Sequence, residues 1–117
     1  MPFCKQACSY CDFYFVTRTS EREHFVERLL AEIRRYKNSP FAAEKVETIY
    51  FGGGTPSLLE PKQVEDILAE IRDVFTLDVR ELTFEVNPDD VNAIFLQDLH
   101  SLGVTRLSMG VQTFQAD

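Results

Sequence analysis

The sequence lacks the features of membrane proteins, nucleic-acid-binding proteins and phosphate-loop proteins. No apolar run approaches the ~20 residues that a membrane-spanning helix needs, and no charged segment followed by an apolar one opens the chain as an export signal would. Basic residues are outnumbered, with 12 Lys and Arg against 19 Asp and Glu, and the net charge is −7. Neither glycine-rich phosphate-loop motif is present. We therefore expect no integral membrane segment, no nucleic-acid partner and no phosphate-binding loop.

Cysteine is also scarce, and its placement is informative. The chain has three cysteines, Cys4, Cys8 and Cys11, and all of them lie close to its start. The odd count and the lack of an export signal argue against disulfides and predict reduced thiols in a cytoplasmic protein. Polar residues interrupt the run, which indicates an exposed loop rather than three buried small side chains.

The thiols in this loop predict an iron–sulfur cluster. Thiolates select zinc, copper(I) or iron–sulfur clusters, and a structural zinc site needs four protein ligands. The chain has no second cysteine pair, and its two histidines, His24 and His100, are not spaced as a ligand pair. Three Cys ligands to a [4Fe–4S] cube leave one iron open for a substrate or cofactor. A small zinc- or Cys-stabilised interaction module is the alternative.

Length and hydrophobic pattern predict one small α/β domain. The chain has 117 residues, 44% of them hydrophobic, and ten Phe, which suffice for a packed core. Apolar spacing and end signals predict helices and strands in alternation. In order, these are a helix from a capping box at 20–23 to Asn38, a strand over 46–51, a helix over 61–75, a strand over 82–86, a helix over 91–102 capped by Gly103, and a strand over 104–111.

This alternation predicts parallel strands and one shared site. Strands separated by single helices pair in parallel through right-handed crossovers. The unusual residues lie at the carboxyl ends of the strands: the glycines 52–54 follow the first, Glu85 and Asn87 close the second, and Gln112 closes the third. In a (β/α) barrel these ends lie on one face, where the site is built. The Cys loop would join that face if a strand preceded it. We therefore interpret the chain as a fragment that covers about half of such a barrel.

The residues at the strand ends suit ligand binding, although each has a simpler explanation. Glycine at a strand end permits positive φ and close approach of a ligand, and a plain β–α turn is the alternative for Gly52, Gly53 and Gly54. A carboxylate such as Glu85 between apolar neighbours must be paired or solvated. Gln112 offers an amide donor and acceptor. Ordinary polar residues of a barrel rim are the alternative for both.

The spacing C-x₃-C-x₂-C, with an aromatic residue before the third Cys, resembles the radical S-adenosylmethionine (SAM) superfamily. The resemblance implies that residues 1–117 are the N-terminal part of a radical SAM core domain, a TIM-like barrel. It implies that the three cysteines hold a [4Fe–4S] cluster whose reduction drives cleavage of SAM. The implied SAM contacts are Tyr10, Gly53, Gly54, Thr55, Glu85 and Gln112.

Four longer segments resemble the oxygen-independent coproporphyrinogen III oxidase group: residues 2–4, 51–59, 85–88 and 106–114. The oxidases carry a further Cys two residues past the third, where this chain has Phe13. Asp12-Phe13 resembles instead the haem-chaperone branch of that group. The resemblance implies a haem or porphyrin ligand, an electron donor such as a flavodoxin-type protein, and a haem-acceptor protein. Oxidation of the propionates of coproporphyrinogen III to vinyl groups is the alternative.

Overall fold

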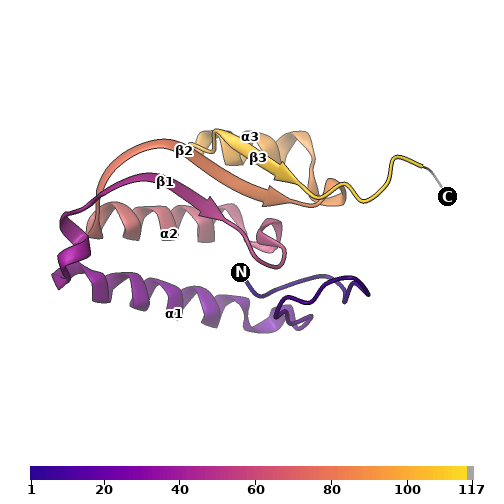
Figure 1. The fold of residues 1–117 in the computed structure, drawn as a ribbon, viewed down its shortest axis with the longest axis horizontal. Coiled ribbons are helices and arrows are strands. Elements are labelled where there is room, and N and C mark those ends of the chain that lie inside the picture. Colours follow the sequence, from indigo (N-terminus) through magenta and orange to yellow (C-terminus); the bar gives the residue numbers. More distant parts are fainter. Residues whose placement is uncertain (116–117) are drawn as a thin grey trace.

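The chain forms a three-stranded parallel sheet whose strands follow the order β1-β2-β3 (Figure 1). The computed structural model describes residues 1–115. Its strands are β1 (Lys45–Phe51), β2 (Thr76–Val86) and β3 (Arg106–Met109), and its helices are α1 (Arg22–Arg35), α2 (Pro61–Val74) and α3 (Ala93–Ser101). Parallel strands joined by single helices confirm the predicted α/β class.

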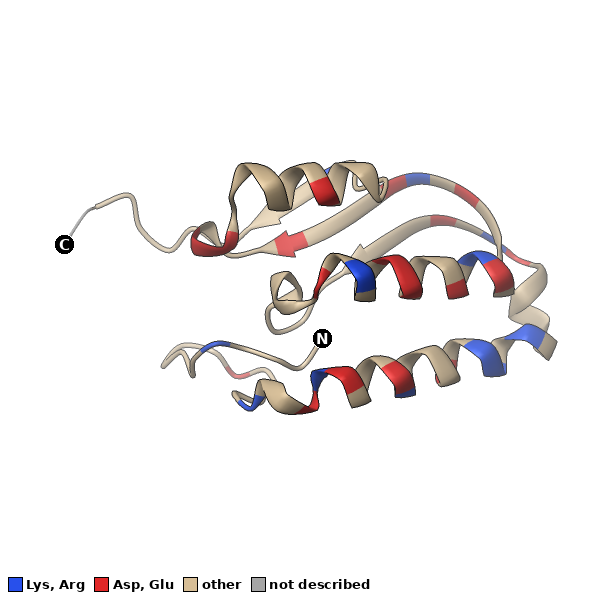
Figure 2. Cartoon of the chain, turned by 180° about the vertical axis from the view of Figure 1, so that it is seen from behind, with Lys and Arg blue, Asp and Glu red and all other residues tan. Residues whose placement is uncertain are grey.

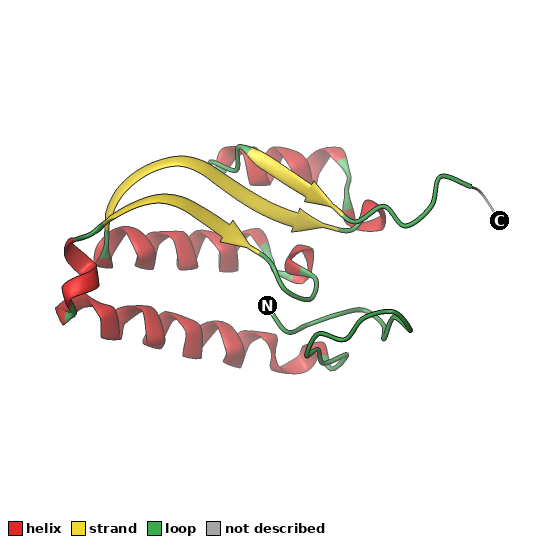
Figure 3. Ribbon diagram, viewed as in Figure 1, coloured by secondary structure: helices red, strands yellow, loops and turns green. Residues whose placement is uncertain are grey.

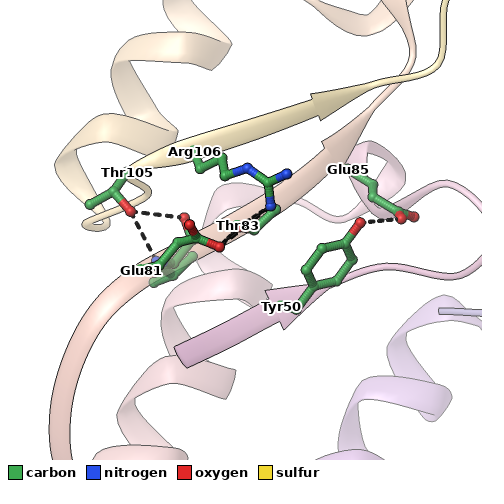
Figure 4. Close-up of polar contacts among 7 residues, drawn as sticks. Tyr50, Glu81, Thr83, Glu85, Thr105 and Arg106 are labelled. Atoms are coloured by element: carbon green, nitrogen blue, oxygen red, sulfur yellow. Dashed lines mark hydrogen bonds and ion pairs between the residues drawn. The ribbon is translucent and has the colours of Figure 1, made fainter. Parts of the chain in front are cut away.

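Helices cover one face of the sheet and form the core with it. Phe51 of β1 stacks on Phe84 of β2, with ring centroids 5.2 Å apart. Residues from all three helices join the buried cluster, which comprises Val26, Phe51, Leu59, Val64, Ile67, Leu68, Leu82, Phe84, Val86, Leu99 and Val104. Because side chains alternate across a strand, Tyr50 and Glu85 lie on the opposite face (Figure 4).

All three strands point toward the same end of the molecule, where the loops that follow them gather (Figure 3). The amino-terminal loop reaches this end as well, because Gly54 donates its main-chain N–H to the Met1 carbonyl at 2.5 Å and Thr55 donates to the Phe3 carbonyl at 2.6 Å. The Cys loop and the strand ends therefore share one end of the molecule. The sequence predicted this on the condition that a strand preceded the loop, and an isolated bridge between Phe3 and Val16 takes that place.

The strand boundaries differ from the predicted ones at β2 and β3. β2 begins at Thr76 instead of residue 82, because Thr76 and Leu77 pair with the start of β1. Its polar residues do not interrupt the strand, since main-chain pairing does not depend on side-chain polarity. β3 covers only 106–109 of the predicted 104–111, because the Val104 N–H donates to the Leu99 carbonyl at the end of α3.

The helix ends show one wrong prediction and one confirmed prediction. The capping box expected at 20–23 is wrong: α1 follows a 3₁₀ turn at Thr19–Glu21 and has no side-chain cap. Gly103 does end α3 in the left-handed region, at φ +92°, and its N–H donates to the His100 carbonyl. Within residues 1–115, none of the helices combines the length and apolar character needed to cross a bilayer.

Candidate functional site

A polar cleft of about 250 Å³ opens beyond the carboxyl ends of the three strands. Its lining comes from the segment after β1 and from the ends of β2 and β3 with the residue that follows each. The lining residues are Gly54, Thr55, Pro56, Glu85, Val86, Asn87, Ser108, Met109 and Gly110. The predicted residues Gly54, Thr55 and Glu85, which are far apart in the sequence, therefore meet in one site.

The Glu85 carboxylate is held by two donors from β1 and the glycine run. Tyr50 donates its hydroxyl to Glu85 Oε1 at 2.5 Å (Figure 4), and the Gly53 N–H donates to Oε2 at 3.0 Å. The hydrogen bond to Glu85 raises the pKa of Tyr50. These bonds offset the cost of a carboxylate between apolar neighbours and fix its orientation at the cleft.

Gly53 and Gly54 allow the segment 1–4 to pack very close to their main chain. Gly53 has φ +113°, and a Cβ there would lie 2.5 Å from the Met1 carbonyl oxygen. A Cβ on Gly54 would lie 2.5 Å from the Phe3 carbonyl oxygen and 3.0 Å from Cys4 Sγ. A side chain at either position would force these segments apart. Close packing as well as the turn therefore requires glycine here.

The Cys loop is closed at its base by main-chain hydrogen bonds. Phe3 and Val16 form an isolated parallel bridge, in which Cys4 donates to the Val16 carbonyl at 3.0 Å and Val16 donates to the Pro2 carbonyl at 2.8 Å. Near the tip of the loop, the Cys11 N–H donates to the Cys8 carbonyl at 3.2 Å. The segment between the two ends of the bridge therefore projects as one loop that carries all three thiols.

The donor set of this loop fits an iron–sulfur cluster. Cys4, Cys8 and Cys11 are free thiols and are partly exposed, and the Cys4 sulfur lies against Gly54 in the cleft lining. The residues from 1 to 115 contain no group of three His, Cys, Asp or Glu side chains already gathered around a metal position. The sulfurs would have to converge further on binding, which a loop without regular secondary structure allows.

Comparison with known proteins decides the family. The sequence profile of the Radical SAM superfamily matches residues 1–117. The chain belongs to the radical SAM superfamily. Membership implies a [4Fe–4S] cluster and SAM as cofactors, and it disfavours the zinc- or Cys-stabilised module.

Two curated relatives and one solved structure show which radical SAM proteins this chain is similar to. It is 40% identical over 116 residues to the heme chaperone HemW of Lactococcus lactis, covering 97% of this chain and 29% of that protein. It is 30% identical to the oxygen-independent coproporphyrinogen III oxidase of Helicobacter pylori, covering 100% of this chain and 26% of that protein. The structure of coproporphyrinogen III oxidase (HemN) from Escherichia coli, a radical SAM enzyme, matches with a TM-score of 0.85 and 32% identity.

The matched region is a limited part of these relatives. The E. coli structure is matched over 98% of this chain and 27% of its own. The chain thus spans less than a third of the length of the radical SAM proteins it resembles. The structural match at this identity confirms the expected partial radical SAM fold.

Three predicted SAM contacts, Tyr10, Gly53 and Gln112, lie outside the cleft lining. Gly53 instead donates its N–H to the cleft residue Glu85. Tyr10 is 67% exposed in the Cys loop, and the neighbouring Cys8 side chain raises the pKa of its hydroxyl. Gln112 is exposed and lies past the end of β3, where its Nε2 is 3.5 Å from the position of a Cβ on Gly110. Their roles as contacts of a radical SAM site remain predictions.

The site also contains polar residues that the sequence predictions did not include. Tyr50 binds Glu85, and Ser108 lines the cleft. Asn87, which the sequence did place beside Glu85 at a strand end, donates its side-chain N–H to Thr55 Oγ1 at 3.4 Å. Alternation along β1 could have placed Tyr50 opposite the core residue Phe51. Ser108 could not have been found this way, because its position beside Glu85 depends on the register between β2 and β3.

Proposed function

We propose that this chain is the cluster- and SAM-binding core of a haem-chaperone-like radical SAM protein. The observation that carries the proposal is the packing of a three-thiol loop against a glycine run that lines an open polar cleft at the strand ends. Cys4, Cys8 and Cys11 would hold the [4Fe–4S] cluster. When bound and reduced, the cluster supplies the electron that cleaves the sulfonium C–S bond of SAM.

The residues around the cleft would bind and orient SAM. Glu85 is presented with its carboxylate already fixed by Tyr50 and Gly53, so it can receive a ribose hydroxyl or the methionine ammonium without reorganising. Gly54 and Thr55 give the ligand close access to the main chain at the end of β1. The remaining proposed SAM contacts are Tyr10, Gly53 and Gln112.

The haem-chaperone branch is supported by the end of the Cys loop and by the relatives. Phe13 stands where the oxidases carry a further Cys, and its side chain is 80% exposed. The heme chaperone of L. lactis is 40% identical to this chain. The proposal includes a haem or porphyrin ligand, a haem-acceptor protein and an electron donor such as a flavodoxin-type protein. The free thiols support a reducing, cytoplasmic setting.

Coproporphyrinogen III oxidation is the second candidate function. The specific observation in its favour is the structural match to the E. coli oxidase, at a TM-score of 0.85. The two candidates share the cluster and the SAM site and differ in what the protein does with the porphyrin.

Anaerobic reconstitution with iron and sulfide tests the cofactor assignment. We expect about four iron and four sulfide per chain, with the broad visible absorbance of a [4Fe–4S] cluster that changes when SAM is added. Zinc supplied in parallel is the competing metal. Stoichiometric zinc with neither iron nor sulfide bound would show that the assignment is wrong.

A product assay separates the two candidate functions. The reconstituted protein is incubated with reductant, SAM and coproporphyrinogen III, and separately titrated with haem. A haem chaperone should bind haem and form no protoporphyrinogen IX. Formation of protoporphyrinogen IX would instead establish the oxidase activity.

A further inference from the structure

A partly buried aspartate outside the cleft lining, Asp90, joins the Cys loop to the turns that follow β1 and β2. Asp90 belongs to the 3₁₀ turn η5 (Pro88–Asp90), directly after the end of β2. Its Oδ1 pairs with the Lys5 ammonium from the Cys loop, and its Oδ2 accepts a hydrogen bond from the Ser57 hydroxyl at 2.5 Å. Ser57 lies in the 3₁₀ turn η4 (Pro56–Leu58), after β1.

Solvent screens this contact less than an ordinary surface ion pair, because the Asp90 side chain is little exposed. The Asp90 side chain is 7% exposed and the Lys5 side chain 51%. A carboxylate so far removed from water needs partners, and here both of its oxygens have one. By contrast, the pair between Lys37 and Asp73 has side chains that are 57% and 63% exposed, so solvent screens most of its attraction.

Lys5, Ser57 and Asp90 come from three segments whose relative positions shape the cofactor site. Lys5 directly follows Cys4, whose sulfur lies against Gly54. The turns η4 and η5 follow the cleft residues Thr55 and Asn87, which are joined by their own hydrogen bond of 3.4 Å. The acidic turn after β2 is visible in Figure 2, and the cation that it meets comes from the Cys loop.

We infer that Asp90 is a positioning residue, which latches the Cys loop to the strand ends through Lys5 and Ser57 and so presets Cys4 beside the cleft. The inference rests on the proposed function only in naming an iron–sulfur cluster as what the loop holds. Asp90 itself lines no part of the cleft and touches no proposed ligand. Its effect is to lower the freedom that the loop must lose when the thiols converge.

Hydrogen–deuterium exchange of the reduced, metal-free protein tests the latch without the cluster. Asp90→Asn removes the charge of the carboxylate, and we expect the hydrogen-bonded amides of Cys4 and Cys11 to exchange about tenfold faster. Lys5→Gln should produce a similar change from the exposed side of the contact, and Lys5→Arg should restore slow exchange. Asp73→Asn, which breaks the exposed pair with Lys37, is the matched control and should leave the loop unchanged.

A second readout connects the latch to cluster binding. After reconstitution, Asp90→Asn and Lys5→Gln should release iron to a chelator several-fold faster than the Asp73→Asn control. Should Asp90→Asn fail to fold, Lys5→Gln decides the question, because half of its side chain is already in solvent. Unchanged exchange of the Cys4 and Cys11 amides in Lys5→Gln would overturn the latch. Failure to bind iron and sulfide would overturn the proposed function, while the exchange data would still decide the latch.

Discussion

Alternate residues of the same strands lie on opposite faces of the sheet. One face contributes to the core, and the other carries polar residues of the site. On the helix-covered face of β2, Leu82, Phe84 and Val86 are buried in the core. On the opposite face, Thr83 donates to Glu81 Oε1 at 2.9 Å and Glu85 accepts from Tyr50 (Figure 4). Since neighbouring residues point to opposite faces, the site can change without changing the core. We therefore expect substitutions at neighbouring positions of one strand to differ: one affects the stability of the core, and the next affects the polar face.

The largest effect on stability is expected for Phe84→Ala. Phe84 is fully buried and stacks on Phe51, so its truncation leaves a cavity in the core and should cost about 3–5 kcal/mol of unfolding free energy. Thr83→Val, at the neighbouring position on the opposite face, is the control and should cost about 1 kcal/mol. Urea denaturation measures both. Equal losses would show that the two faces are not separate.

The largest effect on cofactor binding is expected for Cys4→Ala, Cys8→Ala or Cys11→Ala. Each removes one of the three thiolates, so reconstituted iron and sulfide should fall to background, while the urea midpoint of the metal-free protein stays close to the original. Ser9→Ala is the control within the same loop. Retention of the full cluster absorbance in any Cys variant would exclude that cysteine as a ligand.

A pair of glycine substitutions tests whether the close packing at the strand ends matters beyond backbone strain. Gly53→Ala and Gly103→Ala both place a side chain at positive φ, at a cost of about 1 kcal/mol. Only at Gly53 would the Cβ also collide with the Met1 main chain, whereas at Gly103 nothing lies within 4 Å. Gly53→Ala should therefore weaken cluster retention and Gly103→Ala should not. Equal retention would mean that the packing is unimportant for the site.

The smallest effect is expected for Tyr50. Tyr50→Phe removes one of the two donors that orient Glu85, and we expect SAM affinity to fall about fivefold with little change in stability. Isothermal titration with SAM measures this, with Tyr36→Phe, at the residue that follows α1, as the control. An unchanged affinity would show that the Gly53 N–H orients Glu85 sufficiently by itself.

The same hydrogen bond has a pH signature. Glu85 raises the pKa of Tyr50 above its ordinary value of 10.0, so the contribution of the bond is fully present below pH 10 and is lost as the pH rises through the raised pKa. Glu85→Gln should move the ionisation of Tyr50 to lower pH. Ultraviolet titration of tyrosinate, with Tyr50→Phe identifying the contribution of this ring, checks the direction of the shift.

The fold was predictable where local patterns agree with long-range packing. β1 and α2 were predicted to within a residue at each end, because apolar periodicity and Pro61 mark them clearly. Gly103 was predicted as a cap because its position after α3 requires positive φ. The prediction of a capping box at 20–23 failed because the 3₁₀ turn Thr19–Glu21 leads into α1, and residue types alone do not determine the path of the main chain there.

The sequence by itself determined the alternating α/β order, the three-thiol motif and the polar residues at the strand ends, because these follow from composition and spacing along the chain. Tertiary structure alone decided that Tyr50 orients Glu85, that Gly53 and Gly54 make room for the opening segment, and that Asp90 joins Lys5 to Ser57. Each of these contacts joins residues from separate segments of the chain. The physical reason is that strand register and close main-chain approach set them, and neither is encoded in a local pattern.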